Sequence, residues 1–207
     1  MQHAHRLALI TVLLASAGQS AATDEWKPEL MPREQEIAAA LAAGPAAIRD
    51  GAGLYLLTAT GFELARPSSN GFHCLVERSR PEAFEPQCFD SEGSATLLEQ
   101  VLLRGELRMQ GLGAERIATE IANAWAEGRL RTPTRPGINY MLSEHNRVPV
   151  GPNRVIPYRP HVMFYAPYLT NDDVGGDLSG ASPVFVINEG KPSAYVIVPV
   201  PSGEAND

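Results

Sequence analysis

The sequence predicts an α+β fold, in which a largely antiparallel sheet packs against two central helices. Three observations support this prediction. Strand-like segments come first, between residues 54 and 90; two helical segments follow, between residues 95 and 127; strand-like segments then return, between residues 139 and 200. Strands and helices that are segregated along a chain in this way are typical of α+β proteins, whereas regular alternation of the two would predict a parallel sheet.

The first elements of the domain are expected to be helical. Residues 34–43 are rich in alanine and are followed by Gly44, which predicts a helix and its end. Pro45 can start a further short helical turn, which ends at Gly51.

The apolar pattern then changes to a period of two, which predicts strands. The strand-like segments form an N-terminal meander at residues 54–59, 62–66, 72–77 and 87–90. Thr60-Gly61 separates the first two strands. Asn70-Gly71 separates the next two, and this dipeptide is a strong signal for a tight hairpin.

Two helices are expected in the centre of the chain. Ser94 is placed to cap a helix over residues 95–109, whose apolar arc is wide enough to predict a well-buried helix. A second helix is expected over residues 114–127, with Trp125 on its apolar face and Gly128 at its end.

Regularity fades in the C-terminal part, where residues 133–167 hold seven of the 17 prolines. Strands are expected at residues 139–142 and 161–165. A polar, glycine-rich loop follows at residues 171–182, and residues 184–187 and 195–200 predict a final hairpin.

The N-terminus has the pattern of a secretory signal. Arg6 precedes 11 apolar or small residues at 7–17, a run shorter than the ~20 residues that span a bilayer. Small residues up to Ala22 favour cleavage there, and residues 15–17 (ASA) are a second candidate site; a buried helix or an uncleaved anchor is the alternative. We expect four parts along the chain: a signal peptide at 1–22, a linker at 23–32, one α+β domain at 33–200 and a flexible tail at 201–207.

Composition restricts the partners of the exported chain. Removing residues 1–22 takes away one arginine and no acidic residue, so the formal net charge changes from −7 to −8. An acidic chain is poorly suited to nucleic acid, whose phosphates require a basic face, and to anionic lipid. We therefore expect a periplasmic or secreted protein that neither binds nucleic acid nor inserts into the membrane after signal cleavage.

The two cysteines, Cys74 and Cys88, both belong to the expected mature chain. An oxidising compartment and an even number of cysteines favour a disulfide. A redox pair is the alternative, but the close spacing of two intervening residues is absent. Structural zinc would require two more nearby ligands, and only His73 is close in sequence.

The irregular segment from residue 135 to residue 177 is the expected location of a functional site, because long irregular segments within compact domains are often functional. The acid/base candidates are His145 and His161, with Glu144 or Asp172 as the carboxylate partner. The candidate ligand-binding residues are aromatic and are Tyr140, Tyr158, Tyr165 and Tyr168. The alternative is that these residues only pack a long loop over the sheet.

Metal and cofactor motifs are weak. His161 and Met163 would share one face of a strand and, with Met141 and His145, would offer soft ligands for copper, but a core role suits Met163 better. The acidic residues near Asp172 lack the calcium-loop spacing. No phosphate loop, dinucleotide fingerprint or nucleophile elbow occurs, so we expect no metal and no cofactor.

Three stretches of the mature chain resemble a group of predicted exported bacterial proteins of unassigned function. The stretches are residues 70–78 (NGFHCLVER), residues 135–149, which begin RPGINYMLS, and residues 160–171 (PHVMFYAPYLTN). The resemblance implies a bacterial, exported, single-domain protein, and it implies no role for any residue.

Two functions are consistent with these observations. The first is an exported binding or accessory domain for a small molecule or a protein partner. The second is an extracytoplasmic enzyme with hydrolase-like acid/base chemistry at His145 or His161.

Overall fold

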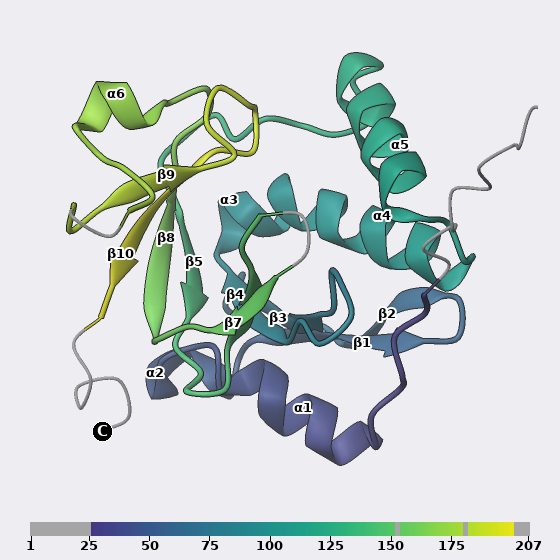
Figure 1. Ribbon diagram of the computed structural model, residues 1–207. Coiled ribbons are helices and arrows are strands. Elements are labelled where there is room, and N and C mark those ends of the chain that lie inside the picture. Colours follow the sequence, from purple (N-terminus) through teal and green to yellow (C-terminus); the bar gives the residue numbers. More distant parts are fainter. Residues whose placement is uncertain (1–25, 152–153, 180–181, 201–207) are drawn as a thin grey trace, which may run out of the picture.

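A computed structural model describes residues 26–151, 154–179 and 182–200 (Figure 1). The expected signal peptide at 1–22 and the expected tail at 201–207 lie outside the described residues. The fold is α+β, with one large, mostly antiparallel sheet packed against helices, as the sequence predicted. Along the described chain, no helix has both the length and the apolar character needed to cross a membrane.

Eight strands form the large sheet, in the order β2-β1-β3-β4-β5-β8-β10-β9. Their bounds are β1 Gly53–Thr58, β2 Gly61–Arg66, β3 His73–Glu77, β4 Glu85–Phe89, β5 Ile138–Met141, β8 His161–Tyr165, β9 Phe185–Ile187 and β10 Tyr195–Pro199. Neighbouring strands are antiparallel except β1 and β3, which are parallel. Strands β6 (Arg147–Pro149) and β7 (Val155–Pro157) form a separate hairpin that the sequence did not predict.

The expected hairpin at Asn70-Gly71 is wrong, because β3 pairs with β1 and not with β2. Local side-chain bonds explain the difference. The amide of Asn70 donates to the Ile48 carbonyl, and the hydroxyl of Ser68 accepts from the Gly71 N–H. These bonds fix an irregular loop that carries the chain past β1, and Gly71, with φ of 86°, supplies its left-handed residue.

The helices cover the two faces of the sheet unequally. On one face, here the inner face, lie α3 (Ser91–Ser94) and α4 (Leu97–Met109), and α5 (Ala114–Ala126) packs on α4 (Figure 1). On the outer face, α1 (Arg33–Leu41) packs against β1, β3 and β4, and α2 (Ala46–Arg49) follows it. The short helix α6 (Asn171–Val174) contacts the edge strand β9.

The expected cap at Ser94 is also wrong, because the predicted helix is split in two. Asp90 caps α3 by accepting a hydrogen bond from the Gly93 N–H, and α4 begins only at Leu97. The Ser94 hydroxyl instead lies 3.0 Å from Nδ1 of His73 on β3. The second helix ends as predicted, with Gly128 at φ of 71°.

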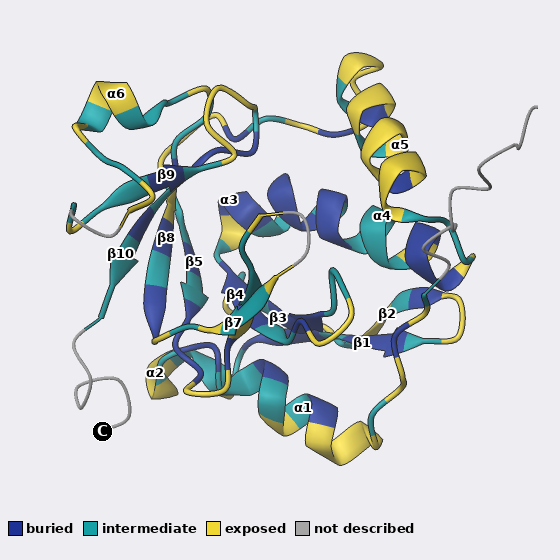
Figure 2. Cartoon of the chain, in the orientation of Figure 1, coloured by how far each residue is buried: buried dark blue, intermediate teal, exposed yellow. Residues whose placement is uncertain are grey.

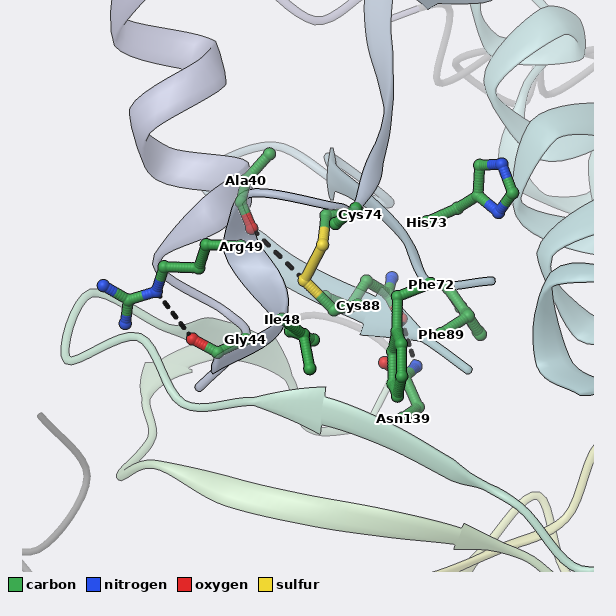
Figure 3. The surroundings of a disulfide bond; sticks show 12 residues. Ala40, Gly44, Ile48, Arg49, Phe72, His73, Cys74, Cys88, Phe89 and Asn139 are labelled. Atoms are coloured by element: carbon green, nitrogen blue, oxygen red, sulfur yellow. Dashed lines mark hydrogen bonds between the residues drawn. A yellow bond between two sulfur atoms is a disulfide. The ribbon is translucent and has the colours of Figure 1, made fainter. Parts of the chain in front are cut away.

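Two apolar clusters hold the layers together (Figure 2). The inner cluster lies between the sheet and α4 and includes Leu75, Phe89, Leu98 and Met163. The outer cluster lies under α1 and includes the predicted disulfide between Cys74 and Cys88, which is present and fully buried (Figure 3).

Candidate functional site

The structure places His145 and Glu144 on an exposed turn between β5 and β6. The adjacent Ser143 is buried, and its hydroxyl accepts a hydrogen bond from the backbone N–H of His145 at 3.1 Å. The Ser143 hydroxyl therefore bonds to the backbone of His145 and not to its imidazole.

The second candidate base, His161, is buried in the inner face of β8. Its Nδ1–H donates to the Arg159 carbonyl at 3.0 Å, and its ring meets the Tyr158 ring edge-on, with centroids 5.0 Å apart. Burial lowers the pKa of His161 to about 4, because the imidazolium would lose its hydration. This histidine is neutral near pH 7.

The other candidate residues lie in different parts of the fold. Tyr140 points to the outer face of β5, beside Phe72. Tyr165 points to the inner face of β8, where its hydroxyl donates to the Ile138 carbonyl at 2.6 Å and lies 3.0 Å from the Asp90 carboxylate. Asp172 and Tyr168 are exposed near β9, and Tyr168 has φ of 67°, at the third position of a tight turn. The predicted site residues thus do not form one pocket in the described structure.

No group of three or more metal-binding side chains occurs among the described residues. The structure does pair His73 with Ser94, which the sequence did not indicate. The Ser94 hydroxyl is also within hydrogen-bond distance of the Gly71 and Phe89 carbonyls, and His73 packs against Gly53 so tightly that a Cβ there would lie 2.4 Å from the ring. These contacts fit a structural link between β3 and α3.

A chain of buried polar side chains crosses the inner face from α4 to β5. Arg104 donates to the Glu77 carboxylate, the Gln87 amide donates to Glu77 at 2.8 Å, and the Asn139 amide donates to Gln87 at 2.8 Å. Burial, and then the nearby Glu77 carboxylate, raise the pKa of Glu85 to about 8. These contacts make the region a network of polar side chains that are bonded to one another.

A groove of about 340 Å³ lies between β2 and α4 on the described surface. Its lining residues are Thr60, Gly61 and Phe62, and, from α4, Glu99, Leu102, Leu103 and Glu106. Two glycines let the helix and the strand approach closely. A Cβ on Gly105 would lie 2.5 Å from the Phe62 ring, and a Cβ on Gly61 would lie 3.0 Å from the Glu106 backbone.

The groove has an apolar floor and an acidic rim. The residues from α4 follow the spacing i, i+3, i+4 and i+7, so they form one stripe along the helix. The half-buried Leu102 and Leu103 lie between Glu99 and Glu106, two helical turns or ~10.5 Å apart. Glu99 is paired with Arg131, whose side chain is 61% exposed, and such surface pairs contribute little stability.

The groove also borders an edge of the sheet. Strand β2 is the first strand in the sheet order, and among the described residues it pairs only with β1. At the opposite edge of the sheet, the side chain of Asn171 bonds to the backbone of β9. Its amide nitrogen donates to the Val186 carbonyl, and its side-chain oxygen accepts from the Val186 N–H. The amide therefore occupies the outward backbone groups of β9.

The sequence contained one signal for the groove. Leu103 widens the apolar arc of α4, and it lines the groove together with Leu102, which also packs against the inner cluster. No sequence pattern predicted that residues 60–62 line the groove, because these residues approach α4 only in the folded chain.

No family model, no curated protein and no solved structure matches this chain.

Proposed function

We propose that this chain is an exported binding domain whose β2–α4 groove holds an extended segment of a partner protein with basic side chains. The observation that carries the proposal is the groove itself, an apolar floor with an acidic rim beside an edge strand. The sequence of residues 1–22 and the buried disulfide support the export part of the proposal.

An extended ligand suits the groove because an edge strand offers unpaired backbone groups. A segment that adds to β2 gains main-chain hydrogen bonds, and its alternate side chains face the space between strand and helix. Phe62, Leu102 and Leu103 would contact its apolar side chains.

Basic side chains suit the rim because Glu99 and Glu106 lie at its two ends. In an extended chain, residues four apart are on the same side and about 13 Å apart. Two flexible arginines at that spacing reach the carboxylates of Glu99 and Glu106. The arginine that binds Glu99 replaces its present partner, the exposed Arg131.

The test uses two peptides of nine residues, built from valine and threonine, with arginine or with glutamate at the third and seventh positions. Isothermal titration is expected to show at least tenfold tighter binding of the arginine peptide. N-methylation of alternate amides in this peptide should abolish binding, because the strand bonds are lost.

The matching variants locate the site. Glu99→Lys/Glu106→Lys should reverse the preference in favour of the glutamate peptide, while Phe164→Arg, on the other face and the other half of the sheet, should leave it unchanged. Equal affinity for both peptides, or an unchanged preference in the lysine variant, would refute the groove as the binding site.

Export is tested separately. The intact mass of protein recovered from the periplasm or medium is expected to match a chain that begins at Thr23 and contains one disulfide. A recovered chain that retains residues 1–22 would contradict signal cleavage. It would not bear on the groove proposal, which the peptide titrations test.

A further inference from the structure

The loop between β2 and β3 contains the only Asn-Gly dipeptide of the sequence, Asn70-Gly71. Asn70 is exposed, and its side-chain oxygen Oδ1 accepts hydrogen bonds from the Phe72 N–H at 3.1 Å and from the Ser68 hydroxyl at 3.2 Å. The oxygen of the same hydroxyl accepts the Gly71 N–H at 2.8 Å. The Ser68 hydroxyl therefore contacts both groups that react when an asparagine side chain cyclises onto the following residue.

We propose that Asn70 is a site of covalent self-modification, at which the backbone nitrogen of Gly71 attacks the side-chain carbon Cγ of Asn70. A bond forms between this nitrogen and Cγ, and the Cγ–Nδ2 bond breaks. Nδ2 takes up the proton of the Gly71 N–H and leaves as ammonia, so the product is a five-membered succinimide. Water, the only co-reactant, then opens the ring and leaves aspartate or isoaspartate at residue 70. The reaction does not use the β2–α4 groove and is independent of the proposed binding function.

Ser68 is placed to move the proton that this reaction must transfer. Its oxygen accepts a proton from the attacking nitrogen, and its own hydrogen passes to Oδ1 of Asn70, so one hydroxyl serves both transfers. The Gly51 carbonyl, at 3.3 Å, is a second acceptor for the hydroxyl hydrogen, but it already accepts the Ser69 N–H at 2.8 Å. The Ser68 hydrogen is therefore directed to Asn70.

The surroundings of Asn70 also favour the attack. The Phe72 N–H donates to Oδ1, where negative charge develops as the Gly71 nitrogen adds to Cγ. Nδ2 donates to the Ile48 carbonyl at 2.8 Å, which fixes the orientation of the amide and keeps Oδ1 towards its two donors. Gly71 has φ of 86° and no side chain that could shield its nitrogen.

The modification changes the contact between this loop and α2. The carboxylate that replaces the amide has no hydrogen to donate, so the bond to the Ile48 carbonyl is lost and one negative charge is added. Isoaspartate also lengthens the main chain by one methylene group, three residues before β3 begins at His73. We expect the modified loop to separate from α2.

The test is peptide mapping by mass spectrometry of the disulfide-bonded mature chain during incubation at pH 8 and 37 °C. Residue 70 is expected to gain 1 Da before any other asparagine does, and labelling by an isoaspartyl methyltransferase should identify isoaspartate there. Ser68→Ala should slow this reaction about tenfold, because the proton relay is lost. Ser68→Thr, which keeps a hydroxyl, should retain most of the rate.

Two controls separate the relay from other effects of the substitution. Ser69→Ala is the matched variant, because the Ser69 hydroxyl bonds to the Gly51 carbonyl at 3.4 Å, and it should react at the wild-type rate. In concentrated urea, where the loop is unfolded, Ser68→Ala and the wild type should react equally fast. Near-UV circular dichroism confirms that each variant is folded before rates are compared.

An Asn70 that stays unmodified while a free peptide of residues 66–73 is converted overturns the proposal. Equal rates of the folded wild type and Ser68→Ala, or equal slowing in Ser68→Ala and Ser69→Ala, overturn the relay through Ser68. A rate difference that persists in urea also overturns it, because the effect would then come from the local sequence and not from the folded loop.

Discussion

Glu77 of β3 and Glu85 of β4 lie directly opposite each other in the register of the sheet. Glu77 is bound by Arg104 and Gln87, whereas Glu85 accepts hydrogen bonds from the hydroxyl and the backbone N–H of Ser79. Burial disfavours the charged form of Glu85, and the nearby Glu77 carboxylate adds to this effect, so the pKa of Glu85 rises to about 8.

This pair predicts that stability falls as pH rises from 5 to 8. The unfolded chain releases the Glu85 proton near its ordinary pKa of 4.5, but the folded chain keeps it until about pH 8. Between these values the folded state binds more protons, so deprotonation favours unfolding. Glu85→Gln removes this dependence, and its melting temperature should exceed that of the wild type at pH 9. Equal melting temperatures of the two proteins from pH 5 to 9 would contradict the assignment.

Removing the disulfide is expected to destabilise the domain. Cys74 and Cys88 are 14 residues apart in sequence, and a cross-link of that length contributes about 3 kcal/mol in the chain-entropy model. Cys74→Ala/Cys88→Ala should lose about that much free energy of unfolding in a urea titration. Reducing the wild-type protein should lower its stability to a similar level. A loss below ~1 kcal/mol would show that α1 and the sheet hold β3 and β4 together without the covalent bond.

The buried ion pair between Glu36 and Arg78 gives a prediction with an internal control. Both side chains are at most 7% exposed, and the Glu36 carboxylate also accepts the Leu57 N–H. Glu36→Ala leaves the Arg78 cation buried without its partner and should cost about 3–5 kcal/mol. The exposed pair of Glu127 and Arg129 is the control, and Glu127→Ala should cost less than about 1 kcal/mol. Similar losses in both variants would refute this ranking.

His161 is expected to lower the stability of the domain at acidic pH. Its pKa in the folded chain is about 4, below the ordinary 6.5, so the unfolded chain gains a proton first as pH falls. This histidine therefore makes stability fall between pH 6.5 and 4. The Hε1 resonance of His161 should titrate with a midpoint near 4 in NMR spectra. A midpoint above 6 would contradict its burial against Tyr158.

Much of the fold follows from local patterns. The helix from residue 114 has its apolar face and its glycine end in sequence, and the structure places it at Ala114–Ala126. The alternation at residues 161–165 became β8 with the same bounds. These elements depend on side-chain periodicity, which is visible in one short window.

The missed features depend on contacts between distant segments. Asn70-Gly71 has the composition of a hairpin turn, but Asn70 bonds to Ile48, 22 residues away, and β3 pairs with β1 in parallel. Tyr140 and Tyr165 belong to the same irregular segment of the sequence, but they lie on opposite faces of the sheet, because β5 and β8 pair with residue 140 opposite Val162. Sequence clustering of aromatic residues therefore did not produce a pocket.

The measurement that tests the central claim most directly is NMR mapping of the arginine peptide on the isotope-labelled mature chain. Binding at the groove predicts that the largest amide shifts fall on β2 and on residues 99–106 of α4, and that exchange of the β2 amides with solvent slows. Shifts centred on other elements, or no shifts at millimolar peptide, would contradict the proposal that this groove is the binding site.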